Sequence, residues 1–162
     1  EFTVPKLRAM RRQVFGMGLL QVVLTMTAAF GGTLALAALL GAITVAIGAF
    51  GAHGLQRITS DPAIIQSYQT AVHYQMIHVL ALLGVGVLFQ QFSPALLQWA
   101  ANLFLAGIFL FSGSIYILTY LNINGMSTKW IVPVTPLGGI LFIAGWVFVF
   151  LAVQKKKIKS EG

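Results

Sequence analysis

The sequence predicts an all-α membrane protein: a four-helix transmembrane bundle plus an additional N-terminal hydrophobic helix. Hydrophobic residues make up 58% of the 162-residue chain and charged residues only 8%, whereas a soluble domain carries about 25% charged residues. Several apolar runs also reach the ~18–20 residues that a helix needs to cross a bilayer. A membrane β-barrel is the less suitable class, because its strands are alternating segments of only ~10 residues.

Five apolar segments are expected, at residues 13–30, 33–52, 62–89, 99–121 and 130–153. The third has the clearest start, because Asp61 can cap a helix and Pro62 is tolerated in the first turn. Trp99 and Trp130 lie at expected segment ends. Amphipathic rings favour the membrane interface, which supports placing helix ends there.

The net charge of +7 is concentrated beside the outermost apolar segments. The basic residues there are Lys6, Arg8, Arg11, Arg12, Lys155, Lys156, Lys157 and Lys159. Such clusters are typical of cytoplasmic flanks that contact anionic lipid, so we expect a lipid bilayer and no nucleic acid as partner. If residues 13–30 span the membrane, the two clusters lie on opposite faces. We expect this fifth helix, but the orientation of the N-terminus stays open.

Small residues recur at three- and four-residue steps along the second segment, where they form one helical face. They are Ala37, Gly41, Thr44, Gly48 and Gly51. Small side chains let helix backbones approach closely in lipid, where hydrophobic driving force between helices is absent. The glycines expected at helix contacts are Gly41, Gly48, Gly51, Gly113, Gly138 and Gly139.

Four sequence blocks, in this order, resemble the YgdD-like family of small inner-membrane proteins. They are "GAFGAHGL" at 48–55, "TAVHYQMIHVLALL" at 70–83, "FSGSIYIL" at 111–118 and "TPLGGILFIAGW" at 135–146. The resemblance covers residues 34–157. It implies a four-helix fold and a multi-pass location in the bacterial plasma (inner) membrane. It implies no activity, because the family is a domain of unknown function.

Residues 1–30 are instead similar to one helix of the Kef-type cation/proton antiporters, which is preceded by paired arginines. The similarity covers a single helix without the rest of that fold, so it implies no antiporter function. We therefore expect three parts: an extra basic segment and hydrophobic helix at 1–31, a YgdD-like four-helix domain at 32–157, and a tail at 158–162.

Polar residues within the expected spans converge on one half of the bundle when the chain is traced back and forth through the membrane. Such residues usually face the bundle interior or a cavity. His73 and His78 point about 140° apart on a helix, so we expect His78 to face inward and His73 to lie nearer the interface. The candidate polar pocket consists of His53, Tyr74, His78, Ser112, Ser114, Tyr116 and Thr135.

Each of these residues also has a purely structural interpretation. His53 could tie down a loop, and His78 could be an interhelical hydrogen-bond partner. Ser112 and Ser114 lack the base that activates a nucleophile, and the chain has no cysteine and no carboxylate near its histidines to complete a metal site. The sequence therefore predicts no catalytic residue, no metal and no cofactor.

The expected function is that of a non-enzymatic membrane component or scaffold, acting as a homo-oligomer or within a larger membrane complex. Two alternatives stay open at this point. One is a small transporter or channel subunit that uses His53 and His78. The other is a subunit that binds haem or a quinone.

Overall fold

The computed structural model describes residues 31–155. Four helical segments in this part are long and apolar enough to cross a membrane, namely Gly31–Ile58, Pro62–Leu88, Pro94–Ile123 and Val134–Gln154. The predicted all-α membrane bundle is therefore confirmed. The expected helix at 13–30 and the tail at 158–162 lie outside the described residues. The division of the chain into three parts accordingly stays a prediction.

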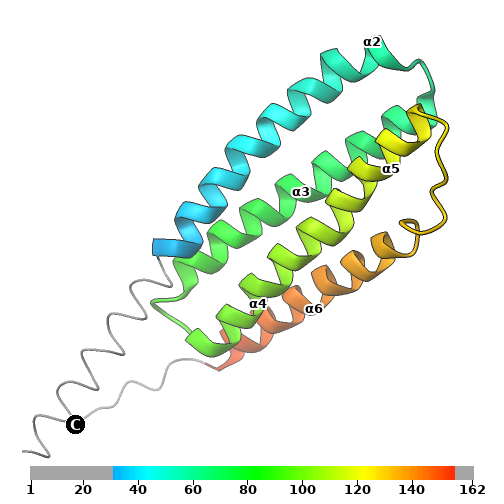
Figure 1. Ribbon diagram of the computed structural model, residues 1–162. Helices are drawn as coiled ribbons and strands as arrows, with labels where there is room; N and C mark the ends of the chain where they lie inside the picture. The colour runs from blue at the N-terminus through cyan, green and yellow to red at the C-terminus, as the bar shows by residue number, and fades with distance from the viewer. Residues whose placement is uncertain (1–30, 156–162) are drawn as a thin grey trace, which may run out of the picture.

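Two of the four segments contain a stretch of π-helix. The first of these four segments, Gly31–Ile58, is called the first segment from here on, and it ends in η1 (Phe50–Leu55) and α2 (Gln56–Ile58). The second segment is α3 (Pro62–Leu88). The third is divided into α4 (Pro94–Gly107), η2 (Ile108–Ser112) and α5 (Gly113–Ile123), and α6 (Val134–Gln154) is the last. Figure 1 shows α3 between the first segment and α4–α5, with α6 on the far side of α4.

Local sequence signals account for the ends of these helices. The Asp61 carboxylate accepts a hydrogen bond from the backbone N–H of Ala63 at 2.9 Å, and Pro62 follows it, so the predicted start of α3 is confirmed. The helix α5 ends at Ile123 and is followed by Gly125, whose positive φ of 65° suits glycine. The N–H of Met126 donates to the carbonyl of Leu121, which closes a Schellman-type cap.

Two helix starts differ from the sequence prediction. The Pro94–Ile123 segment starts at Pro94 rather than at residue 99, because a proline is tolerated in the first helical turn, as at Pro62. The Ser93 side chain, unlike that of Asp61, makes no cap hydrogen bond. The last helix starts at Val134 rather than at residue 130, and Trp130 lies in the preceding turn. Pro133 disfavours helical geometry in the residue before it, which explains the later start.

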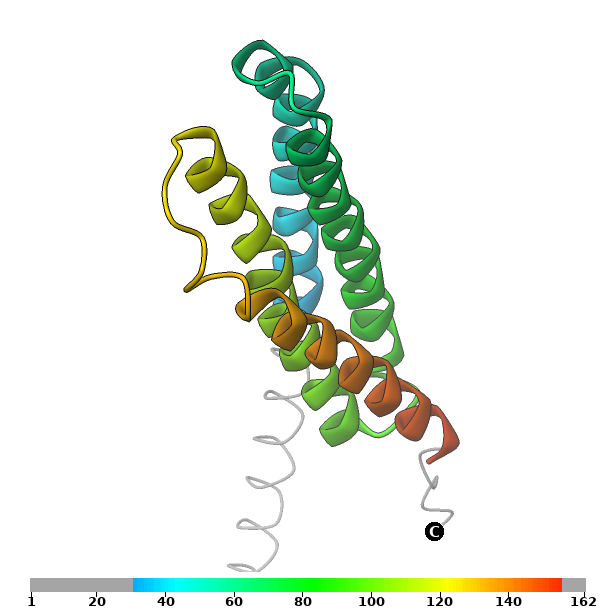
Figure 2. The ribbon, with the colours of Figure 1, turned by 90° about the vertical axis from the view of Figure 1, so that its right-hand side faces the viewer.

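The helix α6 crosses the others obliquely, and it packs mainly on α4 and η2. Figure 2 shows this tilt, which separates the start of α6 from α3. The apolar core fills the half of the bundle that contains the 89–93 turn. Its fully buried side chains include Leu82, Val85, Leu97, Ala100 and Phe104. The polar side chains of the bundle lie largely in the opposite half.

The expected packing glycines fall into three groups. On the first segment, a Cβ at Gly41, Gly48 or Gly51 would lie 3.6, 3.3 or 2.5 Å from a side chain of α3. A Cβ at Gly138 would collide with the backbone of Phe111, whereas one at Gly139 would make only ordinary contact at 3.9 Å. A Cβ at Gly113 would have nothing within 4 Å among residues 31–155. Gly113 therefore makes no close helix contact inside the described bundle.

Candidate functional site

His78 is a buried polar residue of the bundle, with only 4% of its surface exposed. Its ring stacks on that of Phe142 from α6, with centroids 3.4 Å apart and planes within 8° of parallel. Phe104 and Trp146 contact it at centroid distances of 5.5 and 6.3 Å. His73, in contrast, is exposed on the same helix, as the helical spacing predicts.

Both ring nitrogens of His78 have hydrogen-bond partners. Nδ1 lies 2.7 Å from the carbonyl oxygen of Tyr74, which can only accept a hydrogen bond. The indole N–H of Trp146 can only donate, and it points to Nε2 over 3.3 Å. The two bonds together require the neutral imidazole with its proton on Nδ1. His78 thus ties α3 to α6 and is not free to act as an axial ligand of haem.

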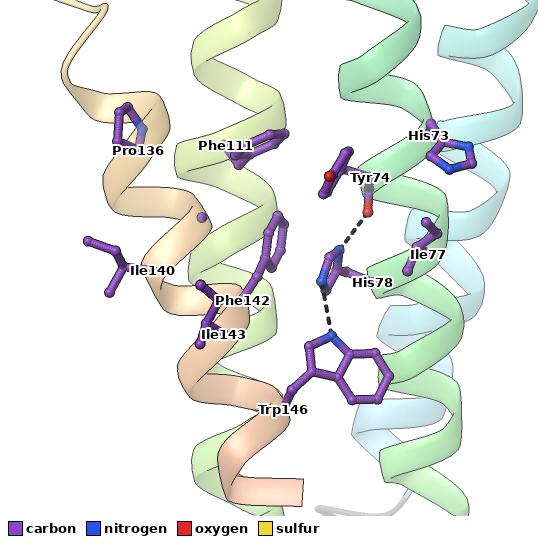
Figure 3. A pocket seen from close by; sticks show the side chains of 11 residues that line it. His73, Tyr74, Ile77, His78, Phe111, Pro136, Ile140, Phe142, Ile143 and Trp146 are labelled. Atoms are coloured by element: carbon purple, nitrogen blue, oxygen red, sulfur yellow. Dashed lines mark hydrogen bonds between the residues drawn. The ribbon is translucent and has the colours of Figure 1, made fainter.

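A cleft of about 640 Å³ lies beside this histidine, between α3 and α6 (Figure 3). Tyr74 and His78 line it from α3, Phe111 from η2, and Phe142 and Trp146 from α6. Its rim is open to the surroundings of the bundle, as residues on both sides show: Tyr74 42% exposed, Ile140 59%, Ile143 67% and Trp146 48%. Because these helices span the membrane, the cleft opens sideways toward lipid.

A second group of polar residues lies on another side of α3 and forms a closed hydrogen-bond chain. Gln75 is 4% exposed, and its amide N–H donates to the Thr44 hydroxyl at 2.8 Å. The Tyr116 hydroxyl donates to the Gln75 amide oxygen at 2.9 Å. Thr44 in turn donates to the carbonyl of Leu40 at 2.6 Å. This chain joins the first segment, α3 and α5 through side chains alone.

The other predicted polar residues also have partners within the protein. The Ser112 hydroxyl donates to the carbonyl of Ala71 on α3 at 2.8 Å. Ser114 and Thr135 share a hydrogen bond of 2.7 Å that joins α5 to α6. The Tyr68 ring lies 5.1 Å from that of Tyr116, and its hydroxyl donates to the carbonyl of Ile47 at 2.9 Å. Of the buried side-chain polar atoms in residues 31–155, Thr119 Oγ1 alone has no partner.

The structure does not bring the predicted pocket residues together as one site. His53 is exposed in η1, its side chain makes no hydrogen bond within residues 31–155, and it belongs to neither the cleft nor the Gln75 chain. The reason is that the small-residue face of this segment, not its histidine, turns toward α3. Tyr74 and His78 line the cleft on one side of α3, whereas Tyr116 bonds to Gln75 on another side. Ser112 bonds to the Ala71 carbonyl, and Ser114 and Thr135 bond to each other, outside both groups.

Three residues that sequence reasoning did not place in the site are central to it: Thr44, Gln75 and Trp146. Gln75 and Trp146 carry a signal in the sequence that could have placed them there. An indole N–H or an amide within a membrane span needs a hydrogen-bond partner, and few partners exist within the spans. What the sequence did not reveal was the tilt and rotation of α6, which decide that Trp146 meets His78.

Charged side chains are confined to the ends of the described helices. Residues 31–155 contain only Arg57, Asp61, Lys129 and Lys155, all in turns or at helix ends. None of the residues that line the cleft carries a fixed charge, and no group of three potential metal ligands exists in this part of the chain. The fold and the site together define a small multi-pass integral membrane protein with an uncharged interior.

The chain belongs to the family described as "Protein of unknown function (DUF423)", which it matches over residues 47–139. It is 44% identical over 120 residues to the UPF0382 membrane protein SAB0533 of Staphylococcus aureus, which covers 74% of this chain and 93% of the relative. The UPF0382 inner membrane protein YgdD of Escherichia coli K12 is 37% identical over 124 residues, 76% of this chain and 90% of the relative.

A relative from fission yeast extends this similarity beyond bacteria. The UPF0382 membrane protein C1782.12c of Schizosaccharomyces pombe is 38% identical over 110 residues, 68% of this chain and 91% of the relative. No solved structure matches the chain. The YgdD-like family and the multi-pass membrane location predicted from the sequence are confirmed. The family has no indicated catalytic activity.

Proposed function

We propose that the protein is a non-enzymatic component of the membrane that packs with itself or within a larger membrane complex. The observation that carries this proposal is the pairing of the polar side chains inside the bundle. Gln75, His78, Ser112, Ser114 and Tyr116 each hydrogen-bond to the protein itself. A buried polar network that is fully paired rigidifies a fold and specifies its packing.

The same pairing argues against an enzymatic or transport role. The Ser112 hydroxyl donates to a backbone carbonyl rather than to a base, and no acid lies within the spans of the described part. A nucleophile needs an adjacent base, and a proton or ion pathway usually uses ionisable groups that line a water-filled cavity. These polar residues hold helices together instead.

Two outward-facing glycines support packing against another membrane helix. Gly84 on α3 is exposed, and a Cβ added there would meet nothing within 4 Å. Exposed Leu80 and Val87 flank it on the same helical face. Gly113 is half-buried, a Cβ there would likewise meet nothing within 4 Å, and it lies between exposed Phe109 and Ile117. Small residues at helix surfaces allow close backbone approach, which drives association in lipid.

Native mass spectrometry of the protein in a mild detergent tests this proposal. We expect an oligomer or a co-purifying membrane complex, and we expect Gly84→Leu or Gly113→Leu to shift the population toward monomer. Val45→Leu is a matched control, because Val45 is 62% exposed on the first segment, away from both glycines. A strictly monomeric protein without partner, or equal behaviour of all three variants, would contradict the proposal.

A further inference from the structure

We propose that the cleft between α3 and α6 binds an uncharged lipid-soluble ring compound of the quinone class. The proposal concerns binding alone and includes no electron transfer. It is independent of the proposed packing role, because neither Gly84 nor Gly113 lines the cleft. The cleft volume of about 640 Å³ falls within the range of about 300–1,000 Å³ typical of small-molecule sites.

Aromatic side chains give the cleft its chemical character. Tyr74 and Phe111 lie with ring centroids 4.9 Å apart at one end, and Phe111 and Phe142 lie 5.6 Å apart. Trp146 lies at the other end, beside His78 (Figure 3). Aromatic faces and edges favour a planar guest through offset-stacked or edge-to-face contacts. A flexible acyl chain gains no such directional contact.

The polar groups of the cleft define the headgroup that it accepts. Both nitrogens of His78 are already paired with Tyr74 and Trp146. Tyr74 lines the cleft, and its hydroxyl has no hydrogen-bond partner within residues 31–155. It can donate to a ring carbonyl or accept from a ring hydroxyl.

Charge excludes the headgroups of ordinary anionic or zwitterionic lipids. A phosphate needs cationic or multiple hydrogen-bond donors, and the lining residues include no lysine or arginine. Burying an unpaired charge in hydrocarbon is costly. The guest that fits is therefore neutral, planar and soluble in the bilayer, with an oxygen at the ring edge for Tyr74. It reaches the cleft sideways through the exposed rim of Ile140 and Ile143.

Tryptophan fluorescence provides the test, because the chain has three tryptophans and Trp146 alone lies in the cleft. Trp99→Phe/Trp130→Phe retains Trp146 as the reporter, and Trp130→Phe/Trp146→Phe retains Trp99 on α4 as the comparison. Decylubiquinone is titrated into phosphatidylcholine vesicles that contain each variant. We expect saturable quenching of Trp146, and quenching of Trp99 that rises only linearly with quinone in the bilayer.

Tyr74→Phe in the Trp146 reporter removes the hydroxyl and retains the ring. We expect it to weaken saturable quenching about threefold to tenfold, the contribution of one hydrogen bond. Tyr120→Phe is the control, because Tyr120 is 63% exposed and outside the cleft. Equal linear quenching of both reporters would overturn the proposal, as would saturable quenching that Tyr74→Phe leaves unchanged.

A brominated phosphatidylcholine distinguishes a ring compound from an acyl chain as the occupant. Trp146 fluorescence is compared between brominated and ordinary phosphatidylcholine vesicles, without and with saturating decylubiquinone. We expect the difference between the two kinds of vesicle to shrink when the quinone is present, because a bound ring compound excludes the brominated chain from the cleft. If brominated acyl chains quench Trp146 and the difference between the two kinds of vesicle is unchanged at saturating quinone, lipid chains fill the cleft and the proposal is wrong.

Discussion

At the scale of single residues, His78 shows how a membrane span accommodates an ionisable side chain. A polar group in hydrocarbon is costly unless it finds a partner. His78 finds two, the Tyr74 carbonyl and the Trp146 indole, and its ring stacks on Phe142. Protonation would add a second N–H that faces the Trp146 donor. The fold therefore requires one protonation state and one tautomer.

We predict that His78 is a neutral imidazole protonated on Nδ1 at pH 7. Nitrogen-15 NMR of histidine-labelled protein measures this directly, because protonated and unprotonated ring nitrogens resonate at well-separated shifts. His78→Gln removes the signal and so assigns it among the three histidines. A doubly protonated ring, or a proton on Nε2, would disprove the hydrogen-bond arrangement.

The Gln75 amide makes a second prediction at this scale. Because it accepts from Tyr116 and donates to Thr44, Gln75→Leu and Tyr116→Phe remove the same interaction. Interhelical hydrogen bonds in membranes contribute about 0.6 kcal/mol on average and up to about 1.7 kcal/mol. A double-mutant cycle of unfolding free energies should give a coupling in this range. Strictly additive effects would show that the two side chains do not interact.

At the scale of elements, the contact between α6 and η2 determines where the last helix crosses the bundle. The Phe111 backbone lies against Gly138, and no side chain fits between them. The π-helical turn at η2 also directs Ser112 toward α3 and Phe111 toward the cleft. Such π-bulges interrupt regular helices and often occur at functional sites.

Adjacent glycines on α6 allow a matched comparison. Gly138→Ala should destabilise the protein by about 1–3 kcal/mol, because the new methyl group overpacks against backbone that cannot move aside. Gly139→Ala should stay within about 0.5 kcal/mol of the parent protein, because its Cβ would make ordinary contact with Phe111 at 3.9 Å. Unfolding free energies in detergent measure both. Equal losses would contradict the close crossing at Gly138.

At the scale of the whole molecule, the sequence predicted the features that depend on local chemistry. Composition and run length gave four membrane helices, and Asp61-Pro62 gave the start of α3. Helical spacing separated inward His78 from exposed His73. These inferences hold because lipid forces each span to be a helix whose polar groups face inward.

Features that depend on how helices are rotated and tilted could not be obtained in this way. The sequence grouped His53 with His78, but the rotation of the first segment leaves His53 exposed. It also grouped Tyr116 with Tyr74, but Tyr116 bonds to Gln75 on another side of α3 than the one that carries Tyr74. The pairing of His78 with Trp146 follows from the oblique crossing of α6, which packing against α4 and η2 decides. Such long-range packing leaves no periodic signature in one chain.

The polar residues of the bundle form closed internal contacts rather than a water-filled path, and water access to them can be measured. The chain has no cysteine, so single thiols can report on water access. Ser112→Cys places one at a position that is fully buried, and Ser60→Cys places one in an exposed turn. Both variants would be reacted with a membrane-impermeant maleimide in nanodiscs, where both membrane faces are accessible.

We predict that the Ser112→Cys thiol stays unlabelled while the Ser60→Cys thiol reacts fully. Denaturation should then make both thiols react, which shows that the buried one is intact. If the Ser112→Cys thiol in the folded protein is labelled as fast as the Ser60→Cys thiol, water reaches the polar half of the bundle, and the closed network is contradicted.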